Sequence, residues 1–502
     1  MELEVCKFLS RIVTAELGYS PANLSKKAAT ADCRADESKR LLADITHLPL
    51  VDGGDRGISM AINISSHGPH PSLTISPPLK ISPSWGIAVV RCKTSRVAVL
   101  PHHPKAHYLP LDSIRGIAAV SIVVHHFVIS KTFDVVYPEK AWIDIPFFHN
   151  AWLFVDLFFV LSGMVISLSY AQADFGTFSL REFMTRRLAR IYPLHIVMLL
   201  VLLALRLLRL GLVAGGVVAT PPAEFEVNNA YSFFLNVFLL QSLGFLNYLS
   251  WNGPSWSIST EFYTYLFFGL VLLCARQVGS RMLFLVLSFL LAICSWLLIV
   301  FVLGRHSLDS HYEFGLIRCV ISFFMGVLTV KAASSLSQKH HEPTLAQSLL
   351  QISALLVSLL LVDLVGERRE ISLVAPLAFA ILLGSLMAFP RAWPLPSLLA
   401  IPPLVWLGKR SYSIYMVHAA VLLLLEYAAR GIAHRLQVLD SAIPGLPATL
   451  NLLLLVALVL ALSELTYRYV EGPGSRVIRK LFERREAMVP PALTADAGAR
   501  PS

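Results

Sequence analysis

The sequence predicts an all-α, polytopic membrane protein with about ten transmembrane helices and one re-entrant segment. The chain has 502 residues, of which 55% are hydrophobic and 15% are charged, whereas an ordinary soluble domain has about 25% charged residues. From residue 111 onward, apolar stretches of about 17 to 23 residues recur, and each can cross a hydrocarbon core of about 30 Å. The Lys and Arg residues are distributed unevenly between alternate loops.

Residues 1–105 differ in kind from the rest of the chain. They are rich in Ser, Pro, His and scattered charges, as in SSHGPHPSLTISPPLKISPSWG, and show no sustained hydrophobic period. Such a composition predicts disorder; alternatively, the segment is an extension assigned from too early a start codon. The first twenty residues lack the continuous apolar core of a signal peptide, so we expect the first span to direct membrane insertion.

The transmembrane domain is expected to cover residues 106–480, followed by a disordered cytoplasmic tail at 481–502. Its spans are predicted at 111–130, 150–170, 192–210, 257–275, 281–303, 312–332, 348–364, 371–389, 411–429 and 449–470. A further apolar segment, AYSFFLNVFLLQSLGFLNYL at 230–249, is long enough to be an eleventh span.

The distribution of positive charge decides between ten and eleven spans. With ten spans and both termini in the cytoplasm, the inner side collects seventeen Lys and Arg residues and the outer side nine, as the positive-inside rule requires. An eleventh crossing would largely reverse this asymmetry. We therefore expect 230–249 to dip in from the outer face, where protein or water must satisfy its backbone. The net charge of +10 then indicates contact with anionic lipid rather than nucleic acid.

The six cysteines show no CxxC spacing. We therefore expect neither a disulfide framework nor a metal site.

The first span, which contains RGIAAVSIVVHHF, carries charged and titratable groups. Arg115 and His126 are eleven residues apart, so on a helix they differ by about 20° and share one face. Asp112 lies within about 60° of that face, and His125 turns about 80° away from it. Because a charged group inside a span costs about 2.5–3.5 kcal/mol, such groups normally face an internal cavity. Alternatively, Asp112 and Arg115 lie at the inner headgroup layer and snorkel.

A histidine in a cavity that water can enter is a common general base for a hydroxyl proton, and it can also carry an acyl group. An arginine on the same face could bind phosphate or stabilise developing negative charge. These roles require other polar groups to converge on the pair.

Three further motifs supply such groups. VDLFFVLSGMVIS places Asp156 and Ser162 in the second span. RRLARIYP, before the third span, offers arginines for a phosphorylated cytosolic ligand, although ordinary positive-inside anchoring explains them equally well. PSWSISTEFYTY places Trp256 and Glu261 at the outer mouth of the fourth span; an interfacial Trp is usually a belt residue, whereas Glu261 is harder to explain in that way.

Together these motifs resemble the membrane acyltransferase family 3, the bacterial integral-membrane O-acyltransferases. The resemblance covers about residues 111 to 480 and rests on six motifs in order and spacing: LDSIRGIAAVSIVVHHF, VDLFFVLSGMVIS, RRLARIYP, PSWSISTEFYTY, GKRSYSIYMVH and YRYVEGPGSRVIRK. It implies transfer of an acyl group, most often acetyl from acetyl-CoA, to a hydroxyl of an extracytoplasmic glycan or glycolipid. It also implies residence in the cell inner membrane, with membrane lipid, acyl-CoA donor and glycan acceptor as partners and no nucleic acid or bound cofactor.

The resemblance also implies roles for individual residues. The catalytic residues would be His126, Arg115 and Glu261, with Glu261 orienting the histidine or the sugar. The acyl donor would bind Arg186, Arg187, Arg190 and Ser162, and the supporting residues would be Asp112, Asp156, Trp256, Tyr412 and His418. Ser113 stands where the family often has glycine. Because only about 32 residues follow residue 470, we expect no C-terminal esterase-like domain.

Two other classes of protein remain open at this stage. In a transporter or flippase the polar groups would line a permeation path, but such proteins favour internal repeats, and the two halves of this chain show none. A non-catalytic membrane scaffold leaves the alignment of Arg115 with His126 unexplained.

Overall fold

The computed structural model describes residues 62–65, 72–75, 108–137, 142–172, 175–216, 224–339 and 342–488. The chain divides into two units, Met1–Ala106 and His107–Ser502. In the first unit, β1 (Ile62–Ser65) and β2 (Ser72–Ile75) pair antiparallel, with Ile62 opposite Ile75. The sequence did not predict these strands. For the rest of 1–105, the predicted disorder and the alternative of an early start codon concern residues outside those described. The disordered tail predicted at 481–502 is wrong for residues 481–488, which continue helix α19 as far as Met488; residues 489–502 lie outside the described residues.

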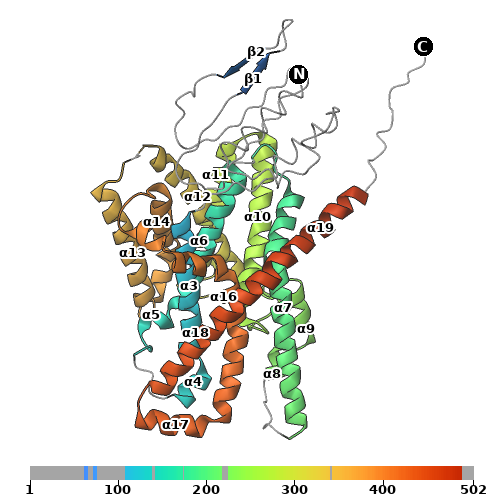
Figure 1. Cartoon of the computed structure of the whole chain (residues 1–502), viewed down its shortest axis with the longest axis vertical. Helices are drawn as coiled ribbons and strands as arrows, with labels where there is room; N and C mark the ends of the chain where they lie inside the picture. The colour runs from blue at the N-terminus through green and yellow to red at the C-terminus, as the bar shows by residue number, and fades with distance from the viewer. Residues whose placement is uncertain are drawn as a thin grey trace, which may run out of the picture. The chain divides into compact units, whose positions relative to one another are not determined.

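The second unit is a helical bundle, and ten of the helices in its described part are long and apolar enough to cross a membrane (Figure 1). The predicted fold class is therefore confirmed. The spans are α3 (Leu109–Val128), η2, α6 and η3 (Ala151–Leu153, Phe154–Ile166 and Ser167–Gln172), α7 (Leu180–Ala214), η4 and α10 (Gly253–Ser255 and Trp256–Val278), α11 and η5 (Arg281–Leu297 and Leu298–Val302), α12 (Gly315–Lys339), α13 (Leu345–Leu364), η6 and α14 (Arg369–Val374 and Ala375–Ala388), α16 (Pro402–Gly431), and α18, η7 and α19 (Leu446–Thr466, Tyr467–Glu471 and Gly472–Met488). Shorter helices connect them: α4 (Lys131–Val136), α5 (Pro146–His149), α8 (Glu224–Val227), α9 (Ala230–Val237), α15 (Leu395–Leu399) and α17 (Ala433–Ala442).

The start of α7 departs from the predicted third span. The sequence placed the third span at 192–210, but α7 begins at Leu180 because the Ser179 side chain caps it by accepting a hydrogen bond from the Glu182 backbone. Arginine is a good helix former, so the helix continues through the RRLARIYP motif and past Pro193. The arginines of this motif therefore lie on the helix, not in a loop before it.

The segment 230–249 is not an eleventh span. It consists of α9 and an irregular stretch in which Leu239 has a positive φ of 58°. The surrounding protein satisfies parts of this backbone: the Ser259 hydroxyl donates to the Leu239 carbonyl at 2.5 Å. Irregular backbone at membrane depth is tolerated only when it is buried in protein in this way, which agrees with a re-entrant segment.

Glycines set two close helix crossings, α3 against α16 and α6 against α12. A Cβ atom on Gly116 would lie 2.5 Å from the Gly408 nitrogen, and a Cβ on Gly408 would lie 2.2 Å from the Asp112 carbonyl oxygen. At the second crossing, a Cβ on Gly163 would lie 1.9 Å from the Phe323 carbonyl oxygen, and one on Gly326 would meet Val160 equally closely. Small residues allow such close backbone approach in membranes. The two crossings therefore fix the positions of α3 and α6 against their neighbours α16 and α12.

Candidate functional site

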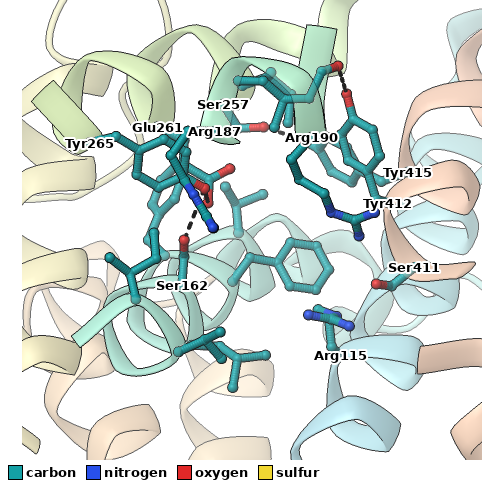
Figure 2. Close-up of a pocket in the computed structure, with 18 residues that line it drawn as sticks. Arg115, Ser162, Arg187, Arg190, Ser257, Glu261, Tyr265, Ser411, Tyr412 and Tyr415 are labelled. Atoms are coloured by element: carbon teal, nitrogen blue, oxygen red, sulfur yellow. Dashed lines mark hydrogen bonds between the residues drawn. The ribbon is translucent and has the colours of Figure 1, made fainter. Parts of the chain in front are cut away.

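Five membrane helices, α3, α6, α7, α10 and α16, line a cavity of about 190 Å³. We call it the arginine cavity because three guanidinium groups line it. Figure 2 shows Ser162, Glu261 and Tyr265 on one side of this cavity and Arg190, Tyr412 and Arg115 on the other. Its polar lining consists of Arg115, Ser162, Arg187, Arg190, Ser257, Glu261, Tyr265, Ser411, Tyr412 and Tyr415. The structure thus brings together candidate residues from five of the six sequence motifs.

Arg115 lines this cavity. This position favours the prediction that Arg115 faces an internal cavity over the alternative that it snorkels to the inner headgroup layer. Its Nη2 donates to Asp112 Oδ1 at 3.0 Å and to the Gly408 carbonyl at 3.1 Å. Asp112 therefore acts as the ion-pair partner that orients Arg115, and the close α3–α16 crossing supplies the second acceptor.

The predicted cluster of three arginines is split by the helix that carries it. Arg187 and Arg190 line the arginine cavity, whereas Arg186 is half exposed and pairs with Glu182 one turn earlier. Residues 187 and 190 are three apart and share a face, and residue 186 points about 100° away from residue 187.

Arg187 is the cavity arginine without an ion pair in the described part of the chain. Arg115 pairs with Asp112 and Arg190 with Glu471. The Arg187 guanidinium lies 5.6 Å from the Tyr170 ring centre and 5.8 Å from that of Phe183. Its Nη2 donates to the Tyr170 hydroxyl at 3.5 Å, and its buried Nε has no hydrogen-bond partner among the described residues. Because no ion pair neutralises it, Arg187 is the cation best placed to receive an anionic ligand.

Glu261 lines the arginine cavity, and among the described residues it forms no hydrogen bond with a histidine. Its Oε1 accepts a hydrogen bond from the Tyr265 hydroxyl at 2.6 Å, and that hydroxyl lies 3.2 Å from Ser162 Oγ. α10 begins at Trp256, and Glu261 lies more than one helical turn further along it. The Glu261 side chain therefore lies at the level of the cavity arginines. The hydrogen bonds of the described residues do not join Glu261 to His126, and the expectation that Glu261 orients the histidine or the sugar stays a prediction.

His126 lies two residues before the end of α3 and outside the lining of the arginine cavity. Eleven helical residues separate it from Arg115, which corresponds to about 16 Å along the axis. His126 Nδ1 lies 2.9 Å from the Ile122 carbonyl oxygen. Because a carbonyl only accepts hydrogen bonds, Nδ1 carries the proton of the neutral ring and Nε2 keeps a free lone pair. His125 instead bonds through Nδ1 to the Phe148 carbonyl at 3.0 Å.

Tyr415 and His418 lie between His126 and the arginine cavity. The ring centre of His418 is 4.8 Å from that of His126 and 5.7 Å from that of Tyr415, which lines the cavity. His418 is 1% exposed, and neither of its ring nitrogens has a hydrogen-bond partner. The three rings form a continuous row from the cavity to the end of α3.

Asp156 lies in a fully buried ion pair with Arg318, a residue that the sequence analysis missed. Arg318 Nη2 donates to Asp156 Oδ2 at 2.6 Å, the Ser322 hydroxyl donates to Oδ1 at 2.8 Å, and both charged side chains are 0% exposed. The signal was a single arginine inside the apolar run GLIRCVISFF. This pair joins α6 to α12 and lies outside the cavity lining.

Trp256 supports this ion pair and does not line the cavity. Its ring centre lies 5.2 Å from the Arg318 guanidinium, and its ring meets His311 edge-on at 5.0 Å. His311 stands in the connection between η5 and α12, outside the spans. Burial and the nearby Arg318 guanidinium lower the pKa of His311 to about 4, so this ring is neutral near pH 7.

Comparison with known proteins agrees with the geometry. A family model described as an acyltransferase domain matches residues 109–468. A provisionally named O-acetyltransferase of Staphylococcus aureus strain MRSA252 is 26% identical over 407 residues, which cover 77% of this chain and 61% of that protein. The O-acetyltransferase OatA of Staphylococcus aureus strain NCTC 8325 is 25% identical over 404 residues, which cover 76% of this chain and 59% of OatA. The chain thus spans about three fifths of the length of these relatives. No solved structure matches it.

Proposed function

Since the chain belongs to this acyltransferase domain family, we propose that it transfers an acyl group, most simply acetyl, from acyl-CoA to a hydroxyl of an extracytoplasmic glycan or glycolipid. The names of the relatives describe O-acetyl transfer. The observation that carries the proposal is the arginine cavity, where the Arg187 guanidinium forms no ion pair with a carboxylate of the described residues.

The donor would occupy the arginine cavity. CoA carries a diphosphate and a 3′-phosphate, and guanidinium groups bind phosphate through paired, charge-assisted hydrogen bonds. Arg187 would make the principal contact, with Arg190 and Arg115 adding positive charge along the same wall. Ser162 and Tyr265 already hydrogen-bond near Glu261, and they would position the donor's polar atoms.

The acceptor would meet the donor near His126. The His126 Nε2 lone pair takes the hydroxyl proton while the acceptor oxygen attacks the thioester carbonyl carbon. The carbon–sulfur bond then breaks, and the CoA thiolate leaves with the electron pair. In the alternative order, Nε2 itself attacks the thioester carbonyl carbon and the CoA thiolate leaves with the electron pair. The acceptor oxygen then attacks the acyl-histidine, the carbon–nitrogen bond breaks, and Nε2 takes up the hydroxyl proton. Either order requires the thioester end of the pantetheine arm to pass the row formed by Tyr415 and His418.

The arrangement suits transfer across a membrane. The arginine end would face the cytoplasm, which supplies acyl-CoA, and both termini would lie on that side. His126, at the opposite end of α3, would face the acceptor on the outer side of the cell inner membrane. A transporter or flippase would not need a base with a fixed tautomer at the end of its path.

The test is mass spectrometry of cell-envelope and secreted glycans from cells with and without the gene. The proposal predicts that one glycan class loses one acyl group in the deletion strain and regains it on complementation. If every glycan keeps its acylation and cells instead lose uptake or export of a compound, the transporter alternative is correct.

A further inference from the structure

We infer that Glu471 is a positioning residue: it holds the Arg190 guanidinium in place at the arginine cavity and thereby sets the affinity for the acyl donor. The inference rests on the proposed function and assigns a role to the YRYVEGPG motif, whose contribution to the site the sequence left undefined. This motif lies in the tenth span, which contributes no side chain to the cavity lining.

Both carboxylate oxygens of Glu471 are engaged. Oε1 accepts a hydrogen bond from Arg190 Nη1, and Oε2 accepts one from the Ser413 hydroxyl at 2.9 Å. The Glu471 side chain is 3% exposed, whereas that of Arg190 is 42% exposed. A buried carboxylate must be paired to remain charged. Glu471 therefore holds Arg190 from the protein side and leaves its remaining donors free toward the cavity.

The backbone of the tenth span is shaped for this contact. Residues Tyr467–Glu471 form the π-helical turn η7 between α18 and α19. A π turn adds one residue to the helix, and such turns are frequent at functional sites. An uninterrupted α-helix would place residue 471 about 100° around the axis from its present direction. The inserted residue thus turns the Glu471 carboxylate toward α7 and α16.

A close helix contact fixes the distance as well as the direction. A Cβ on Gly474 would lie 2.5 Å from the Cβ of Pro193, and Pro193 lies on α7 within one turn of Arg190. Figure 1 shows α18 and α19 as one long helix that crosses α7. Gly474 therefore allows α19 to approach α7 at the level where Glu471 meets Arg190.

The third element at this junction is α16. The Arg190 guanidinium lies 5.7 Å from the ring centre of Tyr412, whose hydroxyl donates to the Ile191 carbonyl. Ser413, the next residue along α16, binds the other oxygen of Glu471. Arg190 is thus held by a carboxylate from the tenth span and by an aromatic face from the ninth.

The experiment measures steady-state transfer from acetyl-CoA by the full chain in membranes, with KM determined separately for donor and acceptor. Glu471→Ala frees Arg190, so we expect the donor KM to rise roughly tenfold or more, as for the loss of a hydrogen bond to a charged group, with the acceptor KM unchanged. Glu471→Gln keeps the length and one acceptor, and it should recover most of the donor affinity.

Glu464→Ala is the matched control. Glu464 lies seven residues earlier on the same span and also pairs with arginines, Arg410 and Arg468, but neither partner lines the cavity. Its donor KM should equal that of the wild type.

A double-mutant cycle separates positioning from a purely structural role. If Glu471 acts through Arg190, Glu471→Ala adds no further rise in donor KM to an Arg190→Ala protein. An additive effect in the cycle, or an unchanged donor KM in Glu471→Ala, overturns the inference. If Glu471→Ala does not accumulate, Glu471→Asp, which keeps the charge and retracts the carboxylate, takes its place in the same cycle. Absence of transfer by the wild type would contradict the proposed function instead.

Discussion

Arg115 and His126 lie on the same helix, but only Arg115 lines the arginine cavity, and the rings of Tyr415 and His418 stand between that cavity and His126. Arg115 and His126 are about 16 Å apart along the axis of α3. In the proposed function, the residues for donor binding and the residue for proton transfer therefore lie at different ends of one site. Substitutions at the arginine end should change the donor KM, and substitutions at the histidine end should change kcat.

The first prediction concerns the arginines of α7. Arg187→Lys keeps the charge but loses the planar fork that binds phosphate through two hydrogen bonds, so the donor KM should rise about tenfold with the acceptor KM unchanged. The measurement is steady-state kinetics with varied acetyl-CoA in membrane vesicles.

Arg186→Lys is the neighbouring control, because Arg186 pairs with Glu182 outside the cavity. Its donor KM should stay near the wild-type value. Equal effects of the two lysine variants, or no effect of either, would mean that the cluster only anchors the helix in the membrane.

The second prediction concerns the buried ion pair. Arg318→Met leaves the Asp156 carboxylate without its partner in a fully buried position, which should cost about 3–5 kcal/mol of stability. The thermal unfolding midpoint in detergent should fall accordingly. Adding Asp156→Asn removes the uncompensated charge, so the double variant should be more stable than Arg318→Met alone.

Arg305→Met provides the comparison for this pair. Arg305 and Glu313 form an ion pair in which both side chains are exposed by more than 40%, and such pairs contribute about 0–1 kcal/mol. A fall in the midpoint as large as that of Arg318→Met would show that burial is not the cause.

The third prediction concerns the α6–α12 crossing. In Gly163→Ala the new Cβ would lie 1.9 Å from the Phe323 carbonyl oxygen, a backbone atom that cannot move without separating the two helices. The variant should lose stability by about 1–3 kcal/mol, as other overpacked sites do, and should also disturb Ser162 beside it. Gly211→Ala has no atom within 4 Å of its new Cβ and should unfold at or slightly above the wild-type midpoint, because alanine favours a helix over glycine. Wild-type stability of Gly163→Ala would mean that the helices do not approach this closely.

Much of the fold could be predicted because each span is a local pattern. Ten apolar stretches and the charge asymmetry were sufficient to give the number of membrane-spanning helices and to exclude 230–249 as an eleventh span. The start of α7 was placed too late because hydropathy falls where arginines begin, although Ser179 caps the helix and arginine continues it.

The site was less predictable because its contacts join helices that are distant in sequence. Periodicity placed Arg115 and His126 on one face of α3, but it could not show that Tyr415 and His418 lie between His126 and the cavity. Arg318 and Asp156 are 162 residues apart, so neither motif alone revealed their pairing. Glu471 escaped notice because a π turn changes the face that it presents, and α-helical periodicity does not include such a turn.

The most direct test of the account is transfer of labelled acetyl from acetyl-CoA to envelope glycan by vesicles that contain His126→Ala, with His125→Ala as the matched control at equal protein level. Loss of a general base costs about 10²–10⁴ in rate, so we expect His126→Ala to retain less than about a hundredth of the wild-type kcat with an unchanged donor KM. His125→Ala, whose ring bonds to the Phe148 carbonyl, should keep most of the activity. If His126→Ala keeps more than about a tenth of the wild-type rate, the loss is smaller than that expected for a general base, and the proposed role of His126 is wrong. Loss of transfer in His125→Ala alone would contradict that role as well.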